Sequence, residues 1–350
     1  MSSPSQQTLL VTGANSFVAG HIIKLALEKG YNVRGTVRTE AAAEKTKALF
    51  PQHSSQLSFT IVPDITKVEN YESAFSASPA VTGVFHVASP FVFDVEDNAK
   101  DLLDPAIQGA VAILEAAKKY GAGKVRRVIN TSSFAAIIDI AQGHRPGYTY
   151  TEADWNPMTY DEALKADSVK AYCASKGLAE KAMWDWVAEH EEAGFDLASI
   201  SPPWVFGPHV GGVETVKKLN ESTALLYKMF DAEKVPATDF AGFADVRDLA
   251  FAQLAAFEVP EAGGQRFLVG QHFDYQSAVD AGRELVPELK SRLPEGNPSY
   301  GKIEETYVVD GSKASKLLGL KYTSLEESMK DSFIELLEGE KRAAAAAASA

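Results

Sequence analysis

The 350-residue chain contains a single cysteine, Cys173. No disulfide can therefore form within the chain, as is expected of a protein from a reducing compartment such as the cytoplasm. The sequence also lacks an apolar run of about 20 residues, the length that a membrane-spanning helix needs. Its first residues, MSSPSQQ, include no basic residue and no apolar stretch, so no signal peptide is expected. We therefore expect a cytoplasmic protein without a membrane span.

Basic residues are too few to balance the acidic ones. The chain has 34 Lys and Arg against 47 Asp and Glu, a net charge of −13. Nucleic acids and anionic membranes are bound by basic surfaces, so neither is an expected partner. The seven histidines are scattered, without an HExxH motif or a close His/Cys pair, and no metal site is expected. The chain also lacks the GxSxG motif of an α/β-hydrolase.

Short apolar runs rich in β-branched residues alternate with longer segments of helical pattern. Such strands, separated by helices, indicate a parallel sheet covered on both faces, which is the doubly wound α/β (Rossmann) fold. The expected strands are 8–12, 32–37, 58–62, 83–88, 125–131, 196–201 and 265–270. The expected helices lie near 17–29, 41–49, 69–77, 100–120, 169–193 and 246–257.

The segment TLLVTGANSFVAGH, residues 8–21, has the strand–turn–helix pattern of a loop that binds the pyrophosphate of a dinucleotide. Gly13 stands at the turn, where a positive φ or a close backbone approach is expected. The free N–H groups of a helix that begins near Phe17 would face the phosphates. Ser16 replaces the usual second glycine, and its hydroxyl could itself bond a phosphate. A plain strand–helix turn without a ligand is the alternative.

The second predicted strand ends in GTVRTE, with Arg38 at its tip. An acidic residue at this place bonds the ribose 2′-OH of NAD. The planar guanidinium of Arg38 instead suits the 2′-phosphate of NADP(H), so the sequence favours NADPH. Glu40 stands nearby, and a solvated charge at a strand end is the alternative for Arg38. Asp64 and Ile65 follow the third strand, where they would suit the adenine edge.

Three side chains indicate proton-coupled hydride transfer. Ser133 ends a predicted strand in NTSSF, and Tyr172 and Lys176 stand four apart in YCASK on a predicted helix. Residues at this spacing share a helical face, and a nearby ammonium lowers the pKa of a phenol. Tyr172 could then protonate a carbonyl oxygen that Ser133 holds, while a nicotinamide supplies the hydride. Capping of the local backbone is the alternative for Ser133, and a second pair, Tyr120 and Lys124, is expected to be structural because it spans a glycine turn.

These motifs and their order resemble the extended short-chain dehydrogenase/reductases. Within them the chain is most similar to fungal NADPH-dependent carbonyl (methylglyoxal/3-methylbutanal-type) reductases and to plant dihydroflavonol and cinnamoyl-CoA reductases. The matching segments are VTGANSFVAGHI, GTVRT, VFHVASPF, NTSSFAA, EADWNP, AYCASKGLAEKAMW, SPPWVFGP, FADVRDLA and DGSKASKLLG. The resemblance implies an NADPH-dependent reductase of aldehydes and ketones that acts as a monomer or a homodimer.

The resemblance also implies a role for individual residues. It makes Ser133, Tyr172 and Lys176 the catalytic triad, with Lys176 also binding the nicotinamide ribose. The implied cofactor-binding residues are Gly13, Phe17 and Val18 at the pyrophosphate, Arg38 at the 2′-phosphate with Lys45 as a candidate helper, Asp64 and Ile65 at the adenine, and Ala88, Pro202 and Val205 near the nicotinamide. Candidate walls of an apolar substrate pocket, some of which could be core aromatics, are Phe91, Phe93, Phe134 and Trp204.

The regular alternation of strands and helices weakens after Pro208. We expect residues 1–208 and 241–270 to form the dinucleotide-binding domain. Residues 209–240 and 271–342 would form a smaller substrate lobe over the carboxyl edge of the sheet, where ligands of this fold bind. The alanine-rich end, 343–350, is expected to be a disordered tail.

Two other functions fit a fold of this kind. An NAD-dependent nucleotide-sugar epimerase or dehydratase would hold NAD tightly, and Arg38 argues against it. A non-catalytic NADP-sensing regulator could dispense with the Tyr/Lys pair, which this chain retains.

Overall fold

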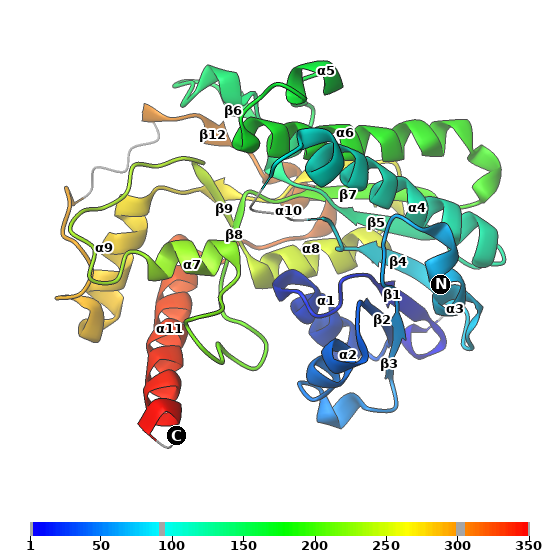
Figure 1. Cartoon of the computed structure of the whole chain (residues 1–350), viewed down its shortest axis with the longest axis horizontal. Helices are drawn as coiled ribbons and strands as arrows, with labels where there is room; N and C mark the ends of the chain where they lie inside the picture. Colours follow the sequence, from blue (N-terminus) through cyan, green and yellow to red (C-terminus); the bar gives the residue numbers. More distant parts are fainter. Residues whose placement is uncertain (1–2, 91–94, 299–304, 349–350) are drawn as a thin grey trace.

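Seven parallel strands form the central sheet of the computed structural model, which describes residues 3–90, 95–298 and 305–348. The strand order is β3–β2–β1–β4–β5–β7–β10 (Figure 1). Their bounds are Thr8–Val11 (β1), Asn32–Val37 (β2), Leu57–Ile61 (β3), Val81–His86 (β4), Arg127–Thr131 (β5), Asp196–Ser201 (β7) and Arg266–Leu268 (β10). The order reverses between β1 and β4, so the predicted doubly wound fold is confirmed.

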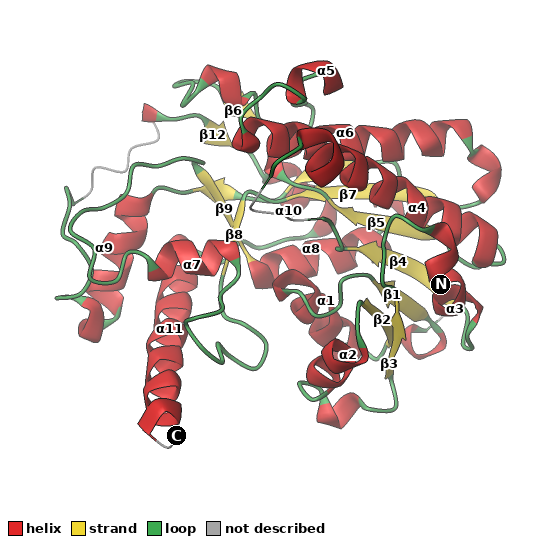
Figure 2. Ribbon diagram, in the orientation of Figure 1, coloured by secondary structure: helices red, strands yellow, loops and turns green. Residues whose placement is uncertain are grey.

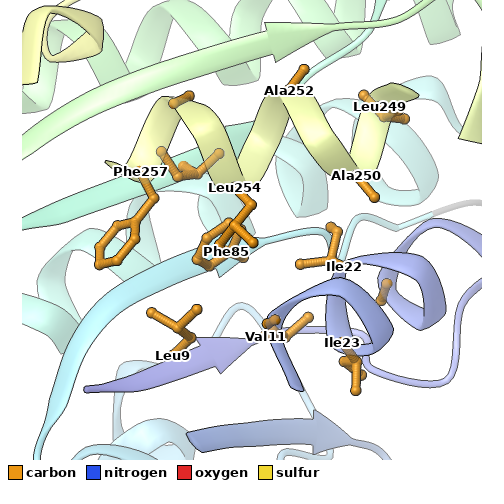
Figure 3. Packing of buried hydrophobic residues seen from close by; sticks show 14 of the residues in the cluster. Leu9, Val11, Ile22, Ile23, Phe85, Leu249, Ala250, Ala252, Leu254 and Phe257 are labelled. Atoms are coloured by element: carbon orange, nitrogen blue, oxygen red, sulfur yellow. The ribbon is translucent and has the colours of Figure 1, made fainter. Parts of the chain in front are cut away.

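Helices cover both faces of the sheet (Figure 2). On one face lie α1 (Phe17–Glu28), α2 (Glu40–Lys47) and α8 (Val246–Glu258), and on the other lie α3 (Glu72–Ser76), α4 (Asp104–Tyr120) and α6 (Ser168–Glu189). Successive strand residues point to opposite faces, and β1 supplies both cores. Leu9 packs with Phe85 and Phe257 under α1 and α8 (Figure 3), whereas Leu10 packs toward α4 and α6.

A smaller C-terminal region has its own core. Helices α7 (Glu221–Tyr227), α9 (Tyr275–Leu285) and α11 (Leu325–Ala348) lie together at one side of the molecule (Figure 1). They bury Met229, Phe273, Met329 and Phe333 as a separate apolar cluster. Two small sheets accompany this region: β8 (Trp204–Phe206), β9 (Gly242–Asp245) and β11 (Gln271–His272) form one, and β6 (Thr149–Tyr150) and β12 (Val308–Val309) form the other. The short helix α5 (Tyr160–Ala163) precedes α6.

Two parts of the C-terminal segment differ from the expectation. Helix α10 (Ser312–Leu318) lies against α8 and β10 and contributes Ala314 and Leu318 to the core of the large sheet, although the sequence assigns it to the substrate lobe. The tail is not disordered throughout, because α11 continues to Ala348. Alanine has the highest helix propensity, and an existing helix extends at little cost.

Candidate active site

The turn after β1 approaches the end of β4 closely. Gly13 has φ +62°, and a Cβ built on it would lie 3.1 Å from the Cα of Ala88, so both expected reasons for a glycine apply. The Thr12 hydroxyl oxygen accepts the N–H groups of Val87 and Ala88 at 3.0 Å each. It therefore donates its hydrogen to Nδ1 of His86, also at 3.0 Å, and burial lowers the pKa of that imidazole to about 4.

A cavity of about 520 Å³ opens at this turn, at the carboxyl ends of β1 to β4. Ligand pockets commonly measure about 300–1,000 Å³, and ligands of this fold bind where the strand order reverses. Six of the predicted cofactor residues line the cavity: Gly13, Ser16, Arg38, Asp64, Ile65 and Ala88. The structure thus brings together residues from four separate strand ends.

Ser16 begins α1 as its N-cap, with Oγ accepting the N–H of Ala19 at 3.4 Å. The next two predicted pyrophosphate residues, Phe17 and Val18, are half-buried and do not line the described cavities. The Phe17 ring instead packs on the ring of His209, with centroids 4.4 Å apart. Val18 packs against the core of the sheet.

The far wall of the cavity carries charged groups of both signs. Arg38 follows β2 directly and is exposed. Asp64 accepts both the hydroxyl and the N–H of Thr66, at 2.7 and 2.9 Å, and these bonds hold the pKa of its carboxyl below the usual range. Lys45, the candidate helper of Arg38, is not a free ammonium, because it forms an ion pair with Glu214.

Tyr172 and Lys176 lie on α6, with the Lys176 ammonium 5.5 Å from the centre of the phenol ring. The ammonium also donates to the Ser89 hydroxyl at 2.5 Å. Burial lowers the pKa of Lys176 to about 8 and raises the pKa of Tyr172. The direction for the phenol is thus opposite to the one predicted from sequence, and its main cause is desolvation of the phenolate by burial.

Ser133 follows the end of β5 and caps the short helix Phe134–Ala136, accepting the N–H of Ala135 at 3.1 Å. The capping alternative is therefore realised. A hydroxyl that accepts one hydrogen bond can still donate its own hydrogen, so this cap is compatible with holding a carbonyl oxygen. The N–H of Phe134 bonds the Pro202 carbonyl at 2.8 Å, which fixes this turn beside β7.

A second, small cavity of about 30 Å³ lies beneath the Lys176 side chain. Its lining includes Lys176, Ser132 and Glu180, together with Ala88 and Ser89. The last two also line the large cavity, as does Pro90. The large cavity at the glycine turn therefore lies next to Lys176, which donates to one of its lining residues, Ser89.

The predicted substrate-pocket residues have different surroundings. Phe91 and Phe93 lie outside the described residues. Phe134 is 1% exposed and packs between the rings of Tyr150 and Tyr307, with centroids 5.4 and 5.6 Å away. It is a core residue of this structure and offers no pocket surface.

Trp204 is half-buried, and its indole donates to Asp239 at 3.2 Å. Its ring meets that of Phe240 edge-on, 5.7 Å away. Pro202 is buried and Val205 half-buried, and neither is among the residues that line the two cavities.

The second Tyr/Lys pair does not share a helical face. Tyr120 is the last residue of α4, and Lys124 lies beyond the turn at Gly121 and Gly123. In the described ranges, no group of His, Cys, Asp or Glu side chains is arranged to hold a metal ion. None of the helices described there is both long and apolar enough to cross a membrane.

Sequence reasoning missed several residues of the site. Thr12 holds two strand ends together, Ser89 accepts from Lys176, and Glu180 bonds Ser132 at 2.6 Å. Thr12 and Ser89 follow strands at the carboxyl edge, which is the signal that could have found them. Glu180 stands four residues after Lys176, one further turn along the same helix.

The fold and this arrangement define a class, the extended short-chain dehydrogenase/reductases, in which one sheet edge carries a dinucleotide cavity beside a Tyr/Lys helix. The model of the NAD dependent epimerase/dehydratase family matches residues 9–270, and the chain belongs to this family.

Similar proteins include reductases from yeast and plants. The NADPH-dependent methylglyoxal reductase GRE2 of Saccharomyces cerevisiae is 38% identical over 343 residues, covering 96% of this chain and 99% of the relative. The crystal structure of yeast methylglyoxal/isovaleraldehyde reductase Gre2 complexed with NADPH matches with a TM-score of 0.90 at 37% identity, over 96% of this chain and 100% of that one. Cinnamoyl-CoA reductase CAD2 of Medicago truncatula is 33% identical, covering 96% and 98%. The resemblance stated from the sequence is thereby confirmed.

Proposed function

We propose that this protein is an NADPH-dependent carbonyl reductase, which converts aldehydes and ketones into alcohols. The observation that carries the proposal is that Ala88, Ser89 and Pro90 line both cavities and that the Lys176 ammonium bonds Ser89, so the large cavity lies next to this ammonium. The relatives that are named reductases and described with NADPH support it.

The residues at the large cavity fit NADPH. Gly13 and Ser16 line the cavity beside the N-terminus of α1, where the free N–H groups of the helix favour an anion such as a pyrophosphate. The exposed guanidinium of Arg38 would bind the 2′-phosphate, and Asp64 and Ile65 would face the adenine. Ala88 and Lys176 would lie at the nicotinamide end. Bound there, NADPH supplies the hydride for the carbonyl carbon.

The protein's own residues would handle the oxygen and the proton. Ser133 would donate a hydrogen bond to the substrate carbonyl oxygen. Tyr172 would give that oxygen its phenolic proton as the C=O bond becomes C–O, so the product is a neutral alcohol. Because burial raises the pKa of Tyr172, the phenol stays protonated until that moment. Lys176, charged below about pH 8, would stabilise the phenolate that remains.

The decisive experiment is NADPH consumption with a panel of aldehydes, ketones and α-dicarbonyls, including methylglyoxal and isovaleraldehyde, the substrates in the relatives' names. We expect turnover with NADPH, and a loss in Tyr172→Phe of about 100-fold or more. Tyr120→Phe is the matched control, because the second Tyr/Lys pair is not on one helical face. Full activity of Tyr172→Phe would refute the mechanism.

The same assay separates the other functions. A preference for NADH would contradict the role given to Arg38 and favour an epimerase or dehydratase. Tight NADPH binding without turnover of any carbonyl would favour a sensor.

We further propose that the C-terminal region, 209–240 and 271–342 apart from α10, shapes the substrate pocket together with Trp204. A cytoplasmic location is supported by the single cysteine. We expect a monomer or homodimer without nucleic-acid partners, in keeping with the net charge of −13. Sedimentation of the purified protein, with and without added nucleic acid, tests both expectations.

A further inference from the structure

Glu180 is a buried carboxylate that the proposed chemistry does not use. It lies on α6, one turn after Lys176 and two turns after Tyr172, and its side chain is 1% exposed. A buried carboxylate is costly unless it is paired and fully hydrogen-bonded. Its partners should therefore show what the residue does.

The Glu180 carboxylate joins three parts of the chain. Its Oε1 accepts from Nε of Arg266 at 2.8 Å and from the indole of Trp184 at 3.2 Å. Its Oε2 accepts from the Ser132 hydroxyl at 2.6 Å and from Nη2 of Arg266 at 3.3 Å. The short, charge-assisted bond from Ser132 is of the strong kind, and it attaches α6 to the residue immediately before Ser133.

Arg266 extends the network to a surface segment. It begins β10, and its Nη1 donates to the carbonyl oxygens of Glu152 and Asp154. Its guanidinium also lies 3.5 Å from the ring centre of Trp155. The guanidinium is therefore fixed on both sides, and it holds the Glu180 carboxylate in one orientation.

We propose that Glu180 is a positioning residue of the reductase. Through Ser132 it sets the place of the Ser133 hydroxyl relative to Tyr172 and Lys176, which stand on the same helix as Glu180. The small cavity is bordered by Ser132, Lys176 and Glu180. A shift of the turn that contains Ser132 and Ser133 therefore alters the space beside the Lys176 ammonium. Misplacement of a reacting group by about 1 Å can cost on the order of 100-fold in rate. This inference rests on the proposed function.

Ser132→Ala and Glu180→Gln test the inference. Ser132→Ala leaves the ion pair of Glu180 and Arg266 intact, so it decides the question even if Glu180→Gln folds poorly. We expect kcat, counted per NADPH-binding site titrated by fluorescence, to fall about 10-fold or more in each variant. The KM for NADPH should stay within about threefold, because neither side chain lines the large cavity. With NADPH deuterated at the transferred position, the isotope effect on kcat should rise, since the chemical step becomes slower.

Asp196→Asn is the matched control. Asp196 pairs with the buried Arg127 in two hydrogen bonds of 2.5 and 2.8 Å, at the amino ends of β5 and β7 and therefore at the opposite edge of the sheet. Loss of this pair should lower the unfolding temperature and leave kcat per site unchanged. A kcat per site within twofold of wild type in Ser132→Ala, or an equal fall in Asp196→Asn and Glu180→Gln, would reduce Glu180 to a structural role. Failure of the wild type to oxidise NADPH with any carbonyl would instead refute the proposed function, before any variant is compared.

Discussion

Burial shifts the pKa values of Tyr172 and Lys176 in opposite directions. It raises the pKa of Tyr172 and lowers that of Lys176 to about 8. In each case the neutral form is favoured, because a charge loses hydration in the interior. The phenol is therefore a stable proton donor, and the ammonium is the group that titrates in the accessible pH range.

This difference predicts the pH dependence of carbonyl reduction. The folded-state pKa of Lys176 lies below its usual value, so the ammonium is present below about pH 8 and is lost above it. We expect kcat to fall as the pH rises through this region, since a neutral amine cannot stabilise the Tyr172 phenolate. The measurement is a pH profile of kcat at saturating NADPH. Lys176→Arg, which stays charged, should move the decline of its residual activity to higher pH, and an identical decline in both proteins would count against the assignment.

Individual residues of the cofactor cavity could be predicted because each follows a strand in the sequence. Gly13, Arg38 and Asp64 stand after three predicted strands and Ala88 ends a fourth, and parallel strands bring their carboxyl ends to one edge. Glu180 could not be predicted in this way. Its partner Arg266 is 86 residues away in sequence, and the contact depends on how α6 packs beside β10.

At the scale of elements, the turn between β1 and α1 combines two requirements on one residue. The positive φ of Gly13 costs other residues about 1–2 kcal/mol, and its neighbour Ala88 leaves no room for a Cβ. We expect Gly13→Ala to lower the unfolding temperature and to weaken NADPH binding about 10-fold or more, because the turn must move into the phosphate site. Thermal unfolding and fluorescence titration with NADPH measure the two effects.

Gly194→Ala separates the effect of a positive φ on stability from the effect of the close contact with Ala88. Gly194 has φ +75° but no neighbour within 4 Å of a built Cβ, so the variant should lose stability and keep its NADPH affinity. Wild-type affinity in Gly13→Ala would contradict the proposed phosphate site.

The strands of the large sheet were predictable, and those of the two small sheets were not. All seven strands of the large sheet and its main helices lie where the apolar pattern predicts them. The strands β6, β8, β9, β11 and β12 have two to four residues each and pair in small sheets outside the large one, which the apolar pattern does not show. The core position of Phe134 could not be predicted either, because its neighbours Tyr150 and Tyr307 come from β6 and from the segment before β12.

The whole molecule is built around separate apolar cores, and the C-terminal one depends on α11. Phe333 is fully buried there, and its ring lies 5.9 Å from that of Phe230. We expect Phe333→Ala to lower the free energy of unfolding by about 3–5 kcal/mol, as large-to-small changes in a core do. Ile334→Ala is the control, because the Ile334 side chain is 38% exposed. This substitution should lower the free energy of unfolding by only about 0.5 kcal/mol. Denaturant unfolding measures both, and equal losses would mean that α11 is not packed as described.

The division of the molecule was only partly predictable. The alternation of strands and helices becomes irregular after Pro208, which indicates a separate region, and the structure has a separate C-terminal core. The sequence could not show that α10 returns to the large sheet, because its apolar residues fit either core equally well. Nor could it show that α11 carries the alanine-rich end as helix to Ala348.

The Thr12 hydroxyl has a consequence for cofactor selection. It bonds the backbone of Val87 and Ala88 and the ring of His86, so it holds together the carboxyl ends of β1 and β4, the neighbouring strands between which the strand order reverses. The part of the large cavity that Val87 and Ala88 line is thus held by hydrogen bonds within the protein, and a preorganised site lowers the cost of binding. A wall that is held in this way also adapts little to its occupant. We therefore expect the discrimination between NADPH and NADH to lie at the exposed rim of the cavity, where Arg38 stands, and a substitution of Arg38 to alter the choice without displacing these strand ends.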